Sequence, residues 1–390
     1  MKLKNFLYLV QLEEYDINRV KAWLKNNPGR EVLEIKKSLV WTTKIKILYT
    51  ISSLLFFLPS QTSVFLTLNL IQPIDNISKY ILVLIAKVKL IIFHRQLKTI
   101  AITGSWGKTT VKETLLPSLS KKYRTAATTA NQNTLIGVSL RILKLPVDTQ
   151  IFICEAGAYY PGDIKQICQL VSPQIGIITA IGSMHLERFG SLANIRKTKM
   201  ELAESIPKTG HLYLPADQKN SSLINFSIKT KNILFFKQLT DVYQSLARLL
   251  DIDSISPIAS SDHRLEIIKN GSMNIIDDTY NSNPVGFAMA LDKLKSLKSK
   301  NNILVTPGMI ELGDIQATEN TRLAKMAGSF CQHIIIVGHT NRQALLAGLK
   351  NTSATIHLLD HTNDTLELLP RITSPDTAVL FENDLPDNYF

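Results

Sequence analysis

The sequence contains few cysteines, glycines and prolines for its length. Its 390 residues include 17 Gly, 15 Pro and 3 Cys, which are Cys154, Cys168 and Cys331. The cysteines are too few and too far apart for a disulfide framework or a Cys-x-x-Cys zinc pair, which is typical of a reducing compartment. A content of 45% hydrophobic and 19% charged residues excludes a disordered chain. We therefore expect roughly two or three domains with buried cores.

Acidic residues are scarce in the first quarter of the chain. Residues 1–98 contain 15 Lys or Arg but only 6 Asp or Glu, and the whole chain has a net charge of +12. A basic surplus often indicates nucleic-acid binding, but this one flanks an apolar tract. Residues 47–74 are 28 consecutive positions without Asp, Glu, Lys, Arg or His. This combination favours a membrane surface over nucleic acid as the partner.

The apolar tract is interrupted by Pro59, whereas a straight membrane span needs about 20 apolar residues. The pattern is compatible with one kinked span, a re-entrant hairpin or two buried helices. A further apolar run, residues 80–93, contains Lys87 and Lys89, which favours a helix lying in the membrane interface. We expect residues 1–97 to be an apolar, basic, mainly helical segment attached to the inner face of the cytoplasmic membrane. The alternative is a hydrophobic core or an oligomer surface.

A glycine-containing loop lies between a predicted strand and a predicted helix. LKTIAIT, residues 97–103, has the apolar character of a buried strand, and helical spacing follows GSWGKTT. This order is the context of a phosphate-binding loop, although the general pattern has Gly where position 102 is Ile. Lys108 would neutralise the β- and γ-phosphates, and the Thr109 hydroxyl would coordinate Mg²⁺. We expect the nucleotide to be bound by Gly104, Ser105, Gly107, Lys108, Thr109 and Thr110.

Three further residues are candidates for metal binding. The apolar segments 151–155 and 174–185 are predicted strands that end at Glu155 and His185. Strand carboxyl ends line the ligand crevice of an open α/β sheet, where a carboxylate can reach Mg²⁺. Lys199 follows His185 by fourteen residues, on a predicted helix. An ammonium is unfavourable beside a metal, whereas a neutral amine can react with CO₂ to give a metal-binding carbamate.

The motifs taken together resemble the Mur ligase family. They occur in the order TGSWGKTT, NQNTLIGVSLRIL, EAGAYYPGDI, IGSMHLERFGS, KTKMEL and LPADQKN, followed by IIDDTYNSNPVGFAMAL and PGMIELGD. The resemblance covers roughly residues 97–340 and is strongest to the branch that joins D-alanyl-D-alanine to a cell-wall muramyl peptide. It implies an ATP-dependent ligase that forms an amide through an acyl phosphate, with two Mg²⁺ ions.

The resemblance also implies roles for single residues. Lys108, His185 and Lys199 would be catalytic, with Lys199 carbamylated. The metal ligands would be Thr109, Glu155, His185 and the Lys199 carbamate. Asn131 and Asn133 would lie at the substrate. The nucleotide would be contacted in addition by Arg264 at phosphate, Asp278 at the ribose, and Asn281 and Asn283 in the cleft.

We therefore expect an α/β protein in three parts. Residues 1–97 form the N-terminal segment, which shows no match to the UDP-binding domain of the family. Residues 98–255 form a parallel-sheet ATP-binding domain, and residues 256–390 a smaller Rossmann-like α/β domain. The expected partners are ATP, a muramyl-peptide carboxylate, an amino-acid or dipeptide amine and a membrane surface, and no nucleic acid.

Three alternatives to this function stay open. The first is a different Mur-like ligase that uses glutamyl or lipid-linked substrates. The second is a P-loop NTPase that forms no amide, which would not need Lys199 or Arg264. The third is a membrane-bound pseudoenzyme that binds nucleotide as a scaffold. Formation of an amide product separates the ligase from the last two.

Overall fold

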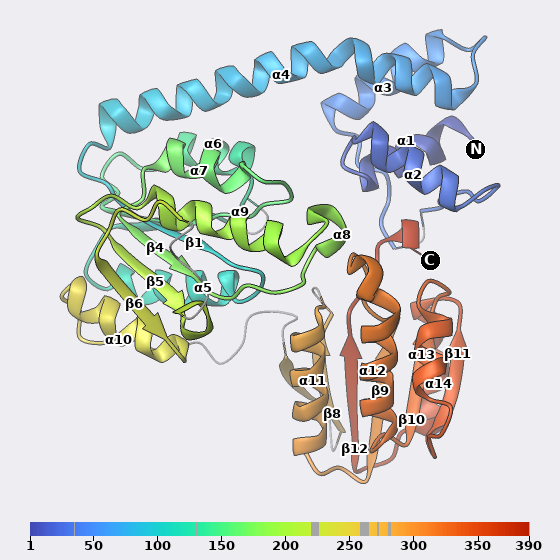
Figure 1. Cartoon of the computed structure of the whole chain (residues 1–390). Coiled ribbons are helices and arrows are strands. Elements are labelled where there is room, and N and C mark those ends of the chain that lie inside the picture. The colour runs from blue at the N-terminus through green and yellow to red at the C-terminus, as the bar shows by residue number, and fades with distance from the viewer. Residues whose placement is uncertain are drawn as a thin grey trace.

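Two six-stranded sheets covered by helices lie beside a group of N-terminal helices (Figure 1). The structure is a computed structural model that describes residues 1–34, 36–129, 132–219, 226–257, 265–270, 273–279 and 282–389. The strands of the first sheet lie between positions 98 and 236, and those of the second between 266 and 382. The expected α/β fold with an N-terminal helical segment is therefore confirmed.

The first sheet is parallel throughout, in the order β2-β3-β1-β4-β5-β6. Its strands are β1 (Lys98–Thr103), β2 (Thr125–Ala127), β3 (Ile151–Glu155), β4 (Ile175–Ile178), β5 (His211–Pro215) and β6 (Asn232–Phe236). One face is covered by α6 (Leu135–Leu143), α7 (Asp163–Val171) and α9 (Leu192–Ser205), the other by α5 (Lys108–Ser120) and α10 (Leu239–Leu249). Burial on both faces explains why these strands are continuous apolar runs in the sequence.

The second sheet has the order β11-β10-β9-β12-β8-β7 and is parallel except for its edge strand β7. Its strands are β7 (Glu266–Asn270), β8 (Met273–Asp278), β9 (Asn301–Thr306), β10 (His333–Val337), β11 (Thr355–Leu359) and β12 (Thr377–Glu382). Helices α11 (Pro284–Ser296), α12 (Gln316–Gly328) and α13 (Arg342–Gly348) cover one face, and α14 (Thr365–Ile372) packs on the other.

The N-terminal region consists of α1 (Leu3–Leu12), α2 (Ile17–Asn26), α3 (Thr43–Leu54) and α4 (Ser60–Phe93). The apolar tract forms two helices, because Pro59 separates α3 from α4. The run 80–93 is helical, as expected, and it continues the 34-residue helix α4, which contains Pro73. Among the helices of the described residues, none combines the length and the apolar character needed to cross a bilayer.

The C-terminal tail fastens the N-terminal helices to the second sheet. After β12 the chain ends in the 3-10 turn Asp387–Tyr389. Tyr8 Oη donates to Asp387 Oδ2 at 2.5 Å, and Trp23 Nε1 donates to the carbonyl of Asn388 at 2.7 Å. Asn388 Nδ2 in turn donates to Glu13 at 2.7 Å. These bonds are buried, so the N-terminal helices and the second sheet hold each other in place.

Candidate functional site

The candidate site lies at the carboxyl edge of the first sheet, where the strand order reverses. Strand β1 sits between β3 and β4, and the chain leaves it toward β2 and β3 before returning to β4 on the other side. Such a reversal separates the loops at the strand ends and creates a crevice for ligands. A pocket in this crevice is lined by residues of the predicted phosphate loop and by Asn133, Tyr159, His185 and Lys199.

The phosphate loop has a backbone that requires glycine. Gly104 has φ +151° and Gly107 has φ +80°, and Gly107 directly precedes α5. A Cβ atom added to Gly104 would lie 2.1 Å from Thr179 Oγ1 and 3.0 Å from the Ala180 amide. Ser105 is buried, and its Oγ donates to the carbonyl of Gly182 at 3.0 Å. The loop is thus fitted closely against the segment after β4.

We expect Gly104→Ala to destabilise the protein by about 2–3 kcal/mol, because the new methyl group would both strain the backbone and collide with Thr179. The matched control is Gly162→Ala, since Gly162 has φ +97° but open space around its Cβ position. That variant should lose only about 1 kcal/mol, from backbone strain alone. Urea unfolding of both variants measures the difference, and equal losses would show that the loop is not tightly packed.

Polar side chains converge on the first turn of α5. Lys108 Nζ donates to the carbonyl of Gly104 at 2.8 Å, so it folds back over the loop. Thr109 Oγ1 donates to Glu155 Oε2 at 3.2 Å, and Lys112 Nζ forms a buried ion pair with the same oxygen at 3.2 Å. Glu155 lies at the end of β3, beside β1. The lysine and carboxylate side chains therefore surround the position where phosphates would meet the helix N-terminus.

The donor set fits Mg²⁺ that arrives with a nucleotide. The Thr109 hydroxyl and the Glu155 carboxylate are oxygen ligands of the kind that Mg²⁺ prefers. Across the residues that the structure describes, no three or more His, Cys, Asp and Glu side chains gather into a metal-binding group. A nucleotide-bound Mg²⁺ needs no such group, because phosphate oxygens and water complete its octahedron.

His185 and Lys199 both line the same pocket as Lys108. His185 is not at a strand end as expected: β4 stops at Ile178, and His185 directly precedes α8 (Leu186–Phe189) with φ +57°. Lys199 is on α9, as expected, and is only 4% exposed. Burial and, to a smaller extent, the charge of Lys108 lower the pKa of Lys199 to about 7, although Asp163 and Glu201 oppose the shift.

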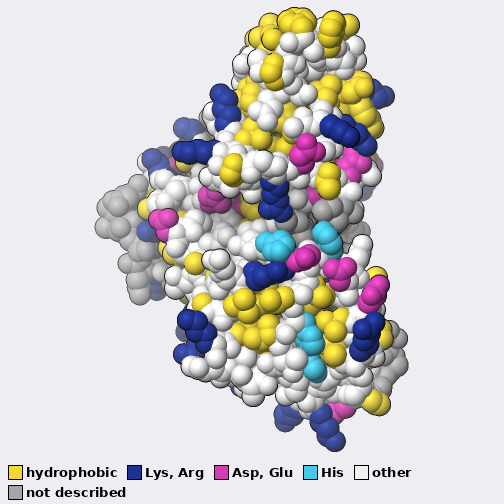
Figure 2. All heavy atoms as spheres, turned by 90° about the vertical axis from the view of Figure 1, so that its right-hand side faces the viewer, with side chains coloured by type: hydrophobic (Ala, Val, Ile, Leu, Met, Phe, Trp, Pro, Cys, Tyr) yellow, Lys and Arg dark blue, Asp and Glu magenta, His cyan; other side chains and the backbone are white. Residues whose placement is uncertain are grey.

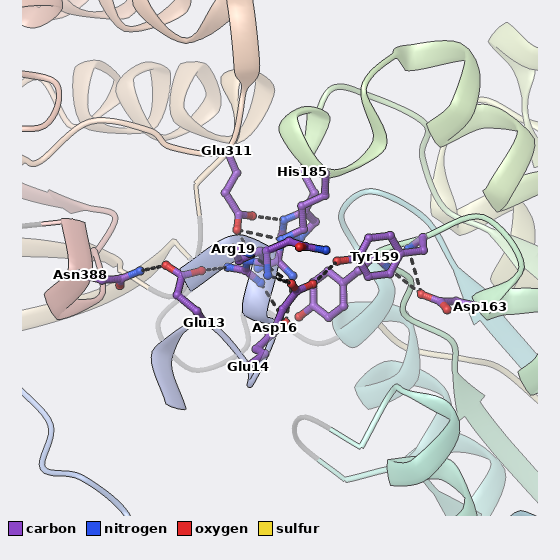
Figure 3. Close-up of polar contacts among 12 residues, drawn as sticks. Glu13, Glu14, Asp16, Arg19, Tyr159, Asp163, His185, Glu311 and Asn388 are labelled. Carbon is purple, nitrogen blue, oxygen red and sulfur yellow. Dashed lines mark hydrogen bonds and ion pairs between the residues drawn. The ribbon is translucent and has the colours of Figure 1, made fainter. Parts of the chain in front are cut away.

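A polar cluster beside this pocket joins three parts of the chain (Figure 3). Glu311, in the loop after β9, contacts His185 Nδ1 and accepts a bond from Arg188 Nη2 at 2.8 Å. Arg188 also donates to Glu14, after α1, at 3.1 Å, and its guanidinium lies 4.1 Å from the centre of the Tyr159 ring. Although burial raises the pKa of Glu311, His185 and Arg188 together hold it at about 2. An ionised carboxylate from a loop of the second sheet thus contacts the carboxyl edge of the first.

Not every predicted site residue reaches this pocket. Asn133 does, and its Nδ2 donates to Glu155 Oε1 at 3.4 Å. Asn283 caps α11 by accepting bonds from two backbone amides, and Asp278 accepts a bond from the Leu265 amide at 3.1 Å. Asp278 also lies against Glu382, whose pKa is raised strongly by burial and by the Asp278 charge. The predictions for Asn131, Arg264 and Asn281 fall outside the described residues.

Three residues that shape the site, Lys112, Arg188 and Glu311, were not predicted from the sequence. Lys112 follows Lys108 by one helical turn, so the spacing could have placed it on the same face of α5. Glu311 belongs to PGMIELGD and Arg188 to HLERFG, motifs that were recognised as wholes. The positive φ of Glu311, +61°, is invisible in the sequence. Only the contact between the two sheets shows that these side chains meet.

Two family models match the chain. The Mur ligase middle domain matches residues 102–251, and the Mur ligase glutamate ligase domain matches residues 263–382. UDP-N-acetylmuramoyl-tripeptide--D-alanyl-D-alanine ligase of Bacillus subtilis (strain 168) is 27% identical over 265 residues, which cover 57% of this chain and 58% of that protein. The protein of the same name from Buchnera aphidicola subsp. Baizongia pistaciae is 31% identical over 263 residues, covering 55% and 57%. The chain thus spans less than two thirds of the length of these relatives.

Solved structures share the fold. MurF from Acinetobacter baumannii superposes with a TM-score of 0.70 at 24% identity, covering 78% of this chain and 77% of that chain. MurF ligase from Thermotoga maritima in complex with ADP gives a TM-score of 0.68 at 22% identity, covering 79% and 80%. These two structures support the fold, and the two domain models together account for both sheets. The chain therefore belongs to the Mur ligase family.

Proposed function

We propose that this protein is an ATP-dependent amide ligase that activates a carboxylate as an acyl phosphate. The observation that carries the proposal is the meeting of Lys108, His185 and Lys199 in one pocket at the phosphate loop. A P-loop NTPase without amide chemistry would need the loop but not a buried lysine beside it. The family relationship supports the same reaction class.

Different groups of the protein have different roles in the proposed phosphoryl transfer. The backbone amides at the start of α5 bind phosphate oxygens, and Lys108 stabilises the charge that builds up on the transferred group. Thr109 and Glu155 would hold Mg²⁺, which neutralises phosphate charge when it is bound. His185 and Lys199 would hold a second Mg²⁺, with Lys199 as its carbamate. The lowered pKa of Lys199 supports this role, because only a neutral amine reacts with CO₂.

The contact between the sheets supports a closing motion in this reaction. An acyl phosphate hydrolyses readily, so the incoming amine must meet it away from water. Glu311 reaches across from the second sheet to His185 and Arg188. We propose that the domains comprise residues 1–97, 98–255 and 256–390, and that Arg264, Asp278, Asn281 and Asn283 of the last complete the nucleotide site.

We propose a muramyl peptide as the carboxylate substrate, with Asn131 and Asn133 beside it, and D-alanyl-D-alanine or a similar amine as the nucleophile. The curated relatives named above carry this substrate pair in their names. We further propose that the reaction takes place beside the inner face of the cytoplasmic membrane, to which residues 1–97 attach the catalytic domains. Attachment would present the enzyme to a membrane-held muramyl peptide at high local concentration.

The substrate is tested by offering one muramyl peptide in UDP-linked and lipid-linked forms, with D-alanyl-D-alanine and ATP. We expect amide product, and more of it from the lipid-linked form, because residues 1–97 show no sequence match to the UDP-binding domain of the family and are proposed to attach to the membrane. Mass spectrometry of the product measures both rates. Efficient use of the UDP-linked form alone would contradict membrane presentation.

Two other outcomes would change the assignment more deeply. ATP turnover without product from either form would indicate a different Mur-like ligase, with glutamyl or other amines as the next candidates. Nucleotide binding without turnover would indicate a pseudoenzyme.

A further inference from the structure

Helix α4 presents a continuous apolar stripe to solvent. It crosses the outer side of α6 and α7 as a long rod (Figure 1). The side of α4 that packs on the protein carries buried residues such as Ala86, whereas large apolar side chains recur on the outer side every three or four positions. Those in the middle of the stripe are Leu70, Ile74, Ile77, Ile81, Leu84 and Val88. With Ile91 the stripe extends about 30 Å along one face of the helix.

The stripe continues onto the end of the molecule formed by α3 and the beginning of α4. Figure 2 shows hydrophobic side chains gathered there, with Lys and Arg side chains beside them. The turn between the two helices carries Phe56 and Phe57, which are 87% and 68% exposed. Contiguous apolar surface of this extent is unusual on a soluble monomer and marks a binding surface.

The charges around the stripe favour an anionic partner. Residues 43–98 contain seven Lys or Arg and a single acidic residue, Asp75. Asp75 is paired with Lys44 at 2.9 Å and Lys79 at 2.8 Å. Lys87 is exposed and lies three residues after Leu84, so it flanks the stripe. The surface is thus apolar in its centre and positive at its edge.

A second copy of the chain fits this surface less well than a lipid bilayer does. A two-fold contact places the same patch on both subunits. It would therefore bring the exposed lysines of one copy toward those of the other, and like charges across an interface are destabilising. An anionic bilayer instead offers acyl chains to the stripe and phosphate groups to the lysines.

We propose that α4, with the α3–α4 turn, lies in the plane of an anionic membrane and buries its apolar stripe at the boundary between the headgroups and the acyl chains. This mode of attachment needs no spanning helix, in agreement with the described helices. It deepens the proposed membrane location and does not depend on which amide the protein forms. The loss of attachment and the loss of ligase activity are therefore measured separately.

The test is co-sedimentation of the full chain with vesicles of equal parts phosphatidylcholine and phosphatidylglycerol, compared with phosphatidylcholine alone. We expect binding to the anionic vesicles that weakens with added salt. Ile77→Asp with Ile91→Asp should lower the binding constant at least about tenfold, because both side chains lie on the stripe. The control, Met289→Asp with Leu366→Asp, changes the net charge equally at exposed apolar positions on α11 and α14, and it should bind normally.

Circular dichroism melting checks that each variant folds. If the stripe variant does not fold, Lys87→Glu tests the same surface through its charge and should also weaken binding to anionic vesicles. The proposal is overturned if the full chain binds neither vesicle, or if stripe and control variants bind equally. It is also overturned if light scattering shows a lipid-free dimer that Ile77→Asp with Ile91→Asp dissociates.

Discussion

Replacing Lys108 with alanine is expected to lower the rate of ATP-dependent amide formation by at least about 100-fold. The side chain folds over the phosphate loop and bonds to the Gly104 carbonyl, which places its charge where the transferred phosphoryl group would lie. A charge preorganised in a water-poor site contributes far more to the transition state than it would in water. The loss of rate is measured as turnover at saturating substrate, monitored by the release of phosphate.

The control for this variant is Lys325→Ala, at an exposed position on α12. It removes the same charge and should leave turnover unchanged. Thermal melting of both proteins distinguishes a loss of turnover from a loss of folding. Undiminished turnover in folded Lys108→Ala would disprove the assignment of the phosphate loop.

Replacing Lys199 with alanine should leave the enzyme nearly inactive, with a loss of about 100-fold or more. The proposed carbamate supplies a negative charge to the second metal position, and alanine cannot. Added acetate or formate should restore part of the activity by occupying the space of the carbamate. Lys197→Ala, at an exposed position two residues away on α9, should behave like the unchanged protein.

The carbamate itself should depend on pH in a defined direction. The pKa of Lys199 is lowered from 10.5 to about 7, first by burial and then by Lys108, so the neutral amine dominates above about pH 7. The carbamate signal in carbon NMR with labelled bicarbonate should therefore fall as the pH drops below 7. The same shift makes the free energy of unfolding rise with pH between about 7 and 10.5, because over that range Lys199 is neutral in the folded protein and charged in the unfolded chain. Below about pH 7 the lysine is charged in both states, and this gain in stability is absent. Full activity in CO₂-free buffer, with no labelled lysine, would refute the carbamate.

The sequence was sufficient where a short segment determines its own structure. The strand before the phosphate loop, the two left-handed glycines and the following helix depend on neighbours within a few residues. The buried strands of both sheets were visible as apolar runs, because a sheet covered on both faces buries every side chain. Lys108, Thr109, Glu155 and Lys199 could therefore be selected as candidates without the structure. Thr109 contacts Glu155, and Lys108 and Lys199 line one pocket, while their roles stay predictions.

Some expectations failed because packing overrode the local pattern. The run 174–185 has the pattern of one strand, but the chain leaves the sheet after Ile178 and passes against the phosphate loop. Residues 80–93 are helical, as their pattern predicts, yet they extend α4 past Pro73 instead of beginning a new helix. A proline inside an α-helix removes one backbone hydrogen bond and destabilises the helix. Tertiary contacts along the rest of α4 offset this loss.

The α/β class, the phosphate loop and the chemical type of the site residues could be predicted from the sequence, because they follow from local periodicity and side-chain chemistry. Three features follow from the packing of the whole chain: Glu311 meets His185, the C-terminal turn binds Trp23 and Tyr8, and one face of α4 stays exposed. Those contacts join residues more than a hundred positions apart, or depend on which side of a helix another element covers. No local pattern encodes such choices, since they are settled when the packed elements bury their apolar faces together.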